Sequence, residues 1–359
     1  MKKVLATILA LVMALSVTTM AWADDVAKIG NTGYATLKEA IEHVANGETI
    51  VLTANVNNGD GIVVASGKNF TLDFAGHTYT ITQNVVGSTG TESQCFQLLK
   101  DSTITMKDGA IVANCAGAKM IIQNYCNLTL DNMKLDATVG TNNVEYVVSN
   151  NCGNVVIKNG TTITAKTTGV AFDVYGGFGD YGDVSVTLEA GATVNGKVEV
   201  ARSSGNQNKN TLTVTGGTVN GDLAVTPSEK TEVAVTGGTF SSDVSAYAAG
   251  NTPVASNNGT YYVGAETIQN AANTLSAGQQ LKIEKGTVAI NGAEYSAGGN
   301  ATYTKPSSGG YYYYHPSTDT KTDEAKGSPK TFDAGIALYV GMALTSAAGV
   351  AFVGKKRED

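Results

Sequence analysis

"LTLDNMKL", residues 128–135, is one copy of a short pattern that recurs along the middle of this chain. In each copy two apolar residues flank a single residue, often a threonine, and a turn follows. This alternation turns both apolar side chains to one face of a β-strand and the residue between them to the other face. The pairs are Phe70/Leu72, Ile104/Met106, Leu128/Leu130, Val155/Ile157, Val186/Leu188, Leu212/Val214 and Val233/Val235. The sequence therefore predicts a series of similar strands, each with one buried face.

Two further apolar positions accompany each copy. One follows five or six residues later, at Ile111, Leu135, Ile163, Val194, Val219 and Phe240. The other lies upstream of each copy, at Leu98/Leu99, Ile121/Ile122, Val147/Val148, Phe172/Val174, Val198/Val200 and Leu223/Val225. Three short strands per unit, at spacings of 21 to 34 residues, predict an all-β right-handed parallel β-helix, a solenoid in which each unit buries its inward side chains on the next. An immunoglobulin-like sandwich is the alternative.

Composition agrees with a strand-rich chain and argues against nucleic-acid binding. The 359 residues include 42 glycines but only 5 prolines, and charged residues make up 15%. The net charge is −7, and it becomes −9 when Lys2 and Lys3 leave with an N-terminal leader. Arg202 and Arg357 are the only arginines. An acidic chain so poor in arginine is unsuited to nucleic acid or to anionic lipid.

The predicted solenoid needs covers at both ends, because a terminal unit exposes backbone edges and apolar side chains. From Thr36 the sequence "TLKEAIEHVANGETIVL" predicts an amphipathic helix that Thr36 and Glu39 cap, followed by a strand. "TIQNAANTLSAGQQLKI" from Thr267 aligns to it without a gap at an offset of 231. We therefore expect an N-terminal cap helix and a C-terminal repeat of the same element.

The two ends of the chain predict export and anchoring. Lys2 and Lys3, an apolar stretch and a small-residue site before Asp24 are typical of a secretory signal peptide, residues 1–23. Residues 334–354 carry no charge and are long enough to span a bilayer, and a basic tail follows them. This order predicts that everything between the two apolar segments is displayed outside the cell.

Just before the predicted span stands Ser328-Pro329-Lys330-Thr331. This motif, the apolar span and the basic tail together resemble the cell-wall sorting signal of Gram-positive surface proteins, with Ser328 and Phe332 in place of that family's leucine and glycine. The resemblance implies that a sortase cleaves after Thr331 and joins it to peptidoglycan. A plain single-span membrane anchor is the alternative.

The strings "AKIGNTGYATLKEAI" and "FTLDFAGHTYT" resemble the first coils of pectin-lyase-like β-helix surface proteins of Gram-positive gut bacteria. The similarity spans roughly residues 27–245. The expected domains are 1–23 signal peptide, 24–60 cap helix and first strand, 61–250 β-helix, 251–295 cap-like module, 296–331 flexible linker with the sorting motif, and 332–359 transmembrane helix and tail.

Catalytic, cofactor and metal sites are not predicted. The lyases and polygalacturonases of that superfold use calcium-binding acids with an arginine, or clustered aspartates, and no matching set stands out here. Asp73 and His77 fall in a turn of the repeat, where structural roles suffice. A carbohydrate-active lyase or glycoside hydrolase on the same scaffold remains the alternative to a non-enzymatic surface protein.

Four cysteines in an exported chain raise the question of disulfides. Cys126 and Cys152 occupy the same position in consecutive units, and Cys95 and Cys115 flank one unit. Stacked neighbours about 4.8 Å apart lie within disulfide range. Small buried thiols fill such positions equally well.

Two long inserts interrupt the regular units. They are "YGGFGDYGD" from Tyr175 and "ARSSGNQNKN" from Ala201, and because they leave the same corner of adjacent units we expect them to lie side by side. Aromatic rings that stack on a sugar, with polar groups beside them, suit glycan contact. The predicted ligand-binding residues are Tyr175, Phe178, Asp180, Tyr181, Asp183 and Arg202. The alternative is that the inserts are ordinary loop insertions without a ligand. The sequence thus favours a surface protein for adhesion or glycan contact, with an inert stalk as a further alternative.

Overall fold

A computed structural model of the protein describes residues 25–307. The predicted signal peptide (1–23), the sorting motif (328–331) and the predicted span and tail (332–359) lie outside these residues. Within residues 25–307, none of the helices is long and apolar enough to cross a membrane. The described part is all-β in character, with only two α-helices and one short 3₁₀ helix, η1 (Ser245–Tyr247).

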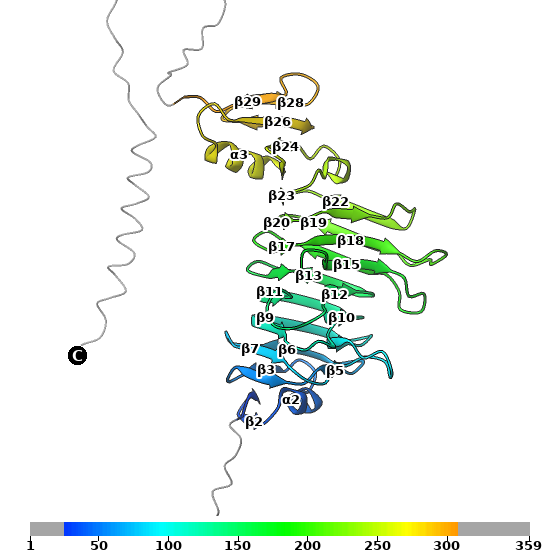
Figure 1. Ribbon diagram of the computed structural model, residues 1–359. Coiled ribbons are helices and arrows are strands. Elements are labelled where there is room, and N and C mark those ends of the chain that lie inside the picture. Colours follow the sequence, from blue (N-terminus) through cyan, green and yellow to red (C-terminus); the bar gives the residue numbers. More distant parts are fainter. Residues whose placement is uncertain (1–24, 308–359) are drawn as a thin grey trace, which may run out of the picture. The chain divides into compact units, whose positions relative to one another are not determined.

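Most strands form three columns in which neighbours pair in parallel (Figure 1). The first column contains β3 (Thr49–Leu52), β6 (Asn69–Asp73), the first halves of β9 (Thr103–Ala113) and β11 (Asn127–Asp136), β13 (Gly153–Ile157), β16 (Val184–Leu188), β19 (Asn210–Val214) and β22 (Thr231–Val235). The second contains β4 (Val56–Gly59), β7 (Thr78–Ile81), the second halves of β9 and β11, β14 (Thr162–Thr164), β17 (Thr193–Asn195), β20 (Thr218–Asn220) and β23 (Gly238–Phe240).

The third column is a separate seven-stranded sheet. It contains β5 (Ile62–Val64), β8 (Gln94–Leu98), β10 (Met120–Asn124), β12 (Tyr146–Asn150), β15 (Val170–Gly176), β18 (Lys197–Arg202) and β21 (Leu223–Val225). The chain visits the three columns in turn. We call one such set of consecutive strands, for example β13, β14 and β15, a rung.

The register of the first column is the one that the repeated pattern predicts. Leu130 lies beside Met106 on one side and Ile157 on the other, and all three are fully buried. Thr129 lies in the row on the opposite face, between Thr105 and Val156. Each buried Leu or Ile contributes about 1.5–3 kcal/mol relative to an exposed one. The apolar alternation in the sequence therefore becomes a continuous row of core side chains.

The third column agrees with the prediction except in β8, its second strand. Ile122 pairs with Phe96, and Asn124, rather than an apolar residue, pairs with Leu98. The predicted pair Leu98/Leu99 is therefore displaced by three residues from Cys95/Phe96, the true counterpart of Ile121/Ile122. The apolar pattern alone was ambiguous here, because Phe96 and Leu98 are both fully buried and either fits the alternation.

The N-terminal cap matches its prediction. Helix α2 (Leu37–His43) begins after Thr36, whose side chain accepts a hydrogen bond from the Glu39 N–H at 3.1 Å. The face with Leu37 and Ile41 is buried in the same core as the rungs. The hairpin of β1 (Ala27–Ile29) and β2 (Thr32–Tyr34) precedes it, and β1 also pairs with β3. Helix and hairpin thereby cover the first rung.

The C-terminal module repeats the helix and the following strand but starts the helix differently. Helix α3 (Ala265–Thr274) begins after Gly264 at φ 89°, so Thr267 lies inside the helix and is not its N-cap as the alignment predicted. Only glycine adopts such a φ readily. Ile268 and Ala271 are buried at the positions equivalent to Leu37 and Ala40.

The module also contains more strands than the aligned segment. They are β24 (Val254–Asn257), β25 (Thr260–Val263), β26 (Gln280–Lys285), β27 (Thr287–Ile290), β28 (Ala293–Ser296) and β29 (Thr302–Thr304). β25 pairs antiparallel with β23 and so attaches the module to the rungs. β29 pairs with β26 and contributes Tyr303 to the module's own core. The module therefore extends beyond residue 295, into the segment predicted as linker.

The register generates a paired test at adjacent positions. Leu130→Asp should lower the free energy of unfolding by about 4 kcal/mol or more, because it buries a carboxyl group between apolar neighbours. Thr129→Asp should cost about 1 kcal/mol, since that side chain is partly exposed on the other face. Urea unfolding of both variants beside the wild type measures the difference. Equal losses at the two positions would contradict the assignment of the faces.

Candidate functional site

Three loops leave the same edge of the third column and form what we call the loop face. They comprise residues 177–183 after β15, 203–209 after β18 and 226–230 after β21. Their positions follow from the fold: parallel strands end at a common edge, so the connections that leave them are neighbours. The loop face is thus built by rungs that the core holds in register.

Direct hydrogen bonds join the first two loops. The Ser203 hydroxyl donates to the Gly177 carbonyl at 3.0 Å, and the Asn208 amide donates to the Phe178 carbonyl at 2.8 Å. The Lys209 backbone N–H donates to a carboxylate oxygen of Asp183 at 2.8 Å. The prediction that the two inserts lie side by side is therefore confirmed.

Four aromatic rings form a cluster on this face. The Tyr125 ring centroid lies 4.7 Å from that of Tyr181 and 5.8 Å from that of Phe178, and Tyr175 lies 5.6 Å from Phe178. Phe178 is 38% exposed and Tyr181 is 36% exposed, whereas Tyr125 is buried beneath them. Burial raises the pKa of the Tyr125 hydroxyl to about 12. The cluster thus has a packed base and two rings that face solvent.

Lys100 borders the aromatic cluster. Its ammonium lies 5.9 Å from the centre of the Tyr181 ring and donates to the Asp180 carbonyl at 3.0 Å. A cation at this distance is attracted to an aromatic ring by about 0.5–1 kcal/mol at an exposed site. This contact fixes the loop tip to the end of β8, three rungs before β15, which the loop follows.

The predicted site residues divide into two groups. Tyr175, Phe178 and Tyr181 come together in the cluster, as the sequence suggested. Asp183 braces the neighbouring loop through Lys209, and Asp180 contributes its main-chain carbonyl to Lys100. The Asp183 carboxylate is thus engaged within the protein, whereas Asp180 uses its main-chain carbonyl and its side chain is exposed.

Tyr125 and Lys100 were not predicted as part of the site. They follow β10 and β8, whereas the aromatic insert follows β15. Tyr125 also stands directly before Cys126, in a stretch that gave no insert signal. Their proximity to the insert depends on the stacking order of the rungs and on the fold of the loop, which reaches back along the column.

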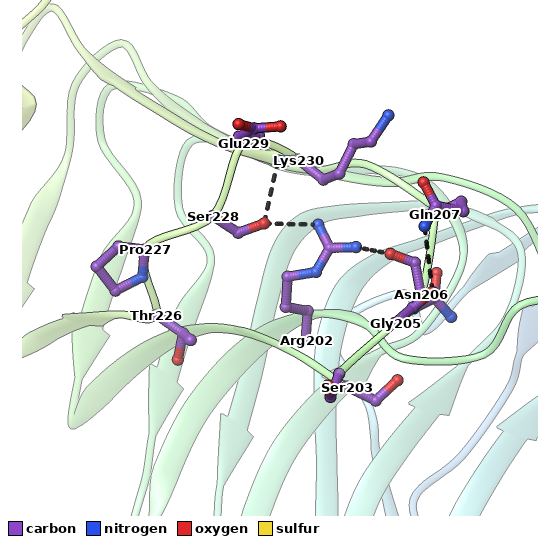
Figure 2. A pocket seen from close by; sticks show the side chains of 11 residues that line it. Arg202, Ser203, Gly205, Asn206, Gln207, Thr226, Pro227, Ser228, Glu229 and Lys230 are labelled. Carbon is purple, nitrogen blue, oxygen red and sulfur yellow. Dashed lines mark hydrogen bonds between the residues drawn. The ribbon is translucent and has the colours of Figure 1, made fainter.

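Arg202 stands in a separate hollow between the second and third loops (Figure 2). The cavity has a volume of about 550 Å³. One guanidinium nitrogen, Nη1, donates to the Ser228 hydroxyl at 3.1 Å, and the other, Nη2, donates to the Asn206 carbonyl. Among residues 25–307, none of the carboxylates forms a salt bridge with Arg202. The sequence singled out Arg202 but gave no indication of the cavity.

A buried carboxyl group lies on the outer side of the third column. Asp173 pairs in register with Glu199, accepts hydrogen bonds from the Asn150 N–H at 2.6 Å and the Ser149 hydroxyl at 3.1 Å, and is almost completely buried. Loss of hydration raises the pKa of Asp173 to about 7, and the Glu199 charge adds to the rise. Glu199 itself binds Lys197 at 3.1 Å.

The cysteines carry free thiols in the structure, which corresponds to the second of the two alternatives, buried thiols rather than disulfides. Cys95 and Cys115 are hydrogen-bonded to each other, which lowers the pKa of Cys115 to about 7 and raises that of Cys95. Cys152 contacts the Tyr181 carbonyl at 2.6 Å, and burial raises the pKa of Cys126 to about 12. The Cys95 and Cys115 thiols therefore lie close together without a bond between them, whereas the Cys126 thiol donates to the Asn124 side chain and the Cys152 thiol to Tyr181.

A group of three or more His, Cys, Asp and Glu side chains that could hold a metal ion is not found among residues 25–307. Asp73 accepts a hydrogen bond from the Ala75 N–H at 2.8 Å and forms a salt bridge with Lys107 at 2.7 Å, so it stabilises a turn and an ion pair.

Searches against protein-family models, curated proteins and solved structures found no match for this chain.

Asp173 generates a prediction about pH. Because its folded pKa lies above the usual value near 4, the folded state keeps a proton that the unfolded state loses, and stability falls as pH rises from about 4 to 7. Asp173→Asn removes the cost of ionising a buried carboxyl group. The hydrogen-bonding geometry is retained, because the asparagine amide N–H can donate to the Ser149 hydroxyl oxygen. We expect the variant to be more stable than wild type at pH 8, by on the order of 2 kcal/mol.

The comparison is made by urea unfolding at pH 5 and pH 8. The gain should shrink at pH 5, where wild-type Asp173 is protonated in the folded state. Glu232→Gln serves as the control, because it removes an exposed carboxyl group of β22 in the first column, which does not contribute to the pKa of Asp173. A gain for Asp173→Asn that is the same at both pH values would show that Asp173 is already ionised at pH 5.

Proposed function

We propose that this protein is a right-handed parallel β-helix, displayed on the surface of a Gram-positive bacterium, that binds glycans or a host surface without catalysis. The three parallel columns, the chain's return to each in turn, and the caps support the fold. The loop face supports the binding role. The N-terminal leader pattern and the C-terminal sorting pattern support display.

The observation that carries the binding role is the aromatic cluster on the loop face. Phe178 and Tyr181 expose more than a third of their surface, although the Phe178 ring packs edge to face on Tyr125 and Tyr175, and the Tyr181 ring packs at a tilt on Tyr125. Rings held in fixed positions lose little freedom when a ligand arrives. The apolar face of a sugar ring stacks on such a surface, and loop carbonyls and amides beside it hydrogen-bond to hydroxyl groups.

The carboxyl pair Asp173 and Glu199 favours a second candidate, a carbohydrate-active lyase or hydrolase. Two acids with different surroundings can divide acid and base roles. Asp173, however, is buried and uses both carboxylate oxygens within the protein, to Ser149 and to the Asn150 N–H. A general acid must reach its substrate directly or through one water. The geometry therefore favours binding over turnover.

Attachment follows from the sorting pattern. Sortase cleavage between Thr331 and Phe332 removes the predicted span and joins Thr331 to peptidoglycan. Pro329 disfavours helical backbone at Ser328 and keeps the substrate extended. The peptidoglycan and the sortase are thus the partners that the pattern implies, and a retained membrane span is the alternative.

Binding is tested with the full exported chain on a glycan array. Phe178→Ala/Tyr181→Ala should weaken binding of any recognised glycan at least about tenfold, because two stacking surfaces of about 0.5–1.5 kcal/mol each are removed. Val139→Ala is the control, since Val139 is an exposed apolar residue that follows β11, far from β15 in sequence and outside the loop face. Thermal melting of both variants verifies that the rungs remain folded.

Two results would contradict the proposal. Unchanged binding by the double variant would place the glycan elsewhere, and no binding by wild type would favour an inert stalk. Bound glycans are also analysed for shortened or unsaturated products. Their appearance with wild type, and their loss in Glu199→Gln, would instead support the enzyme.

Anchoring is tested by extraction. Wild-type protein should leave the cell only after a wall hydrolase has acted, because Thr331 is bonded to peptidoglycan. Thr331→Ala should be extractable with detergent at the mass of the uncleaved chain, and Thr318→Ala is the control outside the motif. Detergent release of wild type with residues 332–359 still attached would show that the plain membrane anchor is correct.

A further inference from the structure

We propose that the Arg202 cavity binds the anionic group of an acidic sugar. The inference deepens the proposed glycan-binding function and rests on it. It adds a ligand class that the aromatic cluster does not specify, because aromatic stacking accepts neutral and acidic sugars alike. The cavity supplies a cation, neutral polar groups and space for a ligand. Its lining comes from loop 203–209, which follows β18, and from loop 226–230, which follows β21.

The first argument is the charge state of the guanidinium. Arginine remains protonated and offers five N–H donors in one plane. In this structure its two hydrogen bonds go to a hydroxyl and a carbonyl, both neutral acceptors. Within residues 25–307 its charge has no carboxylate partner. A carboxylate or sulfate group could therefore pair with it without displacing an internal ion pair.

The second argument is the fixed position of the side chain. Arg202 is the last residue of β18 and pairs in register with Gly176 of β15. Asn206 holds the guanidinium from its own loop, and Ser228 holds it from the loop of the next rung. Figure 2 shows the guanidinium between these two contacts. Binding then costs less side-chain entropy than it would with a free arginine.

The third argument is the composition and size of the cavity. Hydroxyl and amide side chains from both loops line it, and the volume of about 550 Å³ lies within the range of about 300–1,000 Å³ typical of ligand sites. Apart from Arg202 these groups are Ser203, Ser204, Asn206, Gln207, Thr226 and Ser228. Such groups match the hydroxyls of a sugar ring better than a small inorganic ion.

The fourth argument is the local charge. Lys230 adds a second cation to the cavity wall, and Glu229 is its single carboxylate. The chain as a whole carries −7 and repels anions. The cavity is therefore a place where an anionic ligand is favoured on an otherwise unfavourable surface. Ser203 and Asn208 hydrogen-bond to the aromatic loop, so the cavity and the cluster stand on adjoining loops and one oligosaccharide can contact both.

The test uses three matched probes with the full exported chain: N-acetyllactosamine, its sialylated form and its sulfated form. Calorimetry should show that at least one acidic probe binds about tenfold tighter than the neutral one. Arg202→Gln should lower the affinity for the acidic probes to the affinity for the neutral probe. Arg202→Lys should retain part of the preference for the acidic probes. Lys209→Gln is the charge-matched control, because Lys209 lies on the same loop but does not line the cavity.

The outcomes separate this inference from the function on which it rests. Equal affinity for neutral and acidic probes in wild type, or an acidic preference that survives Arg202→Gln, would overturn the inference and leave neutral glycan binding intact. A sulfated probe preferred over the sialylated one would identify the anion as sulfate. If wild type binds none of the three probes and no glycan on the array, both proposals fail. Neutral-probe binding by Arg202→Gln verifies that the loop face is still formed.

Discussion

The parallel register between successive rungs is the constraint on which the rest of this structure depends. No single strand here can bury its apolar face alone, because the partner for each inward side chain is the equivalent residue one rung away. Leu130, for example, is enclosed by Met106 and Ile157. The same constraint leaves both terminal rungs incomplete, and a hairpin with a helix covers the first of them. Stability and the need for caps thus have one origin.

The register also determines where insertions and larger side chains can be tolerated, and which loops contact one another. At Gly153 an added Cβ would lie 2.5 Å from the Cys126 carbonyl carbon, so the entry to β13 has no room for a side chain. Loops 177–183 and 203–209, by contrast, extend outward and still remain in contact, because the strands before them are paired. A surface made of separate sequence segments is therefore held together by core residues that never touch a ligand.

The repeat pattern sufficed to predict the rows of core residues, the N-terminal cap and the adjacency of the two inserts. It failed where the position of an element depends on local backbone conformation, or where the burial of a residue depends on several rungs at once. Gly264 moved the start of α3 upstream of Thr267, and the alternation could not choose between Phe96 and Leu98. The burial of Asp173 was also invisible, since an isolated aspartate between Phe172 and Val174 is equally compatible with an exposed outer face.

The loop face illustrates how a protein can orient a charged side chain without pairing it with an opposite charge. The acids nearest in sequence on the adjoining loop are Asp180 and Asp183, and a carboxylate paired with Arg202 would have to be displaced by any anionic ligand. Asp183 instead accepts from the Lys209 N–H. Neutral acceptors, Ser228 and the Asn206 carbonyl, orient the guanidinium without cancelling its charge. Because orientation and neutralisation are separated in this way, the energy of a new ion pair at Arg202 is not first spent on breaking an old one.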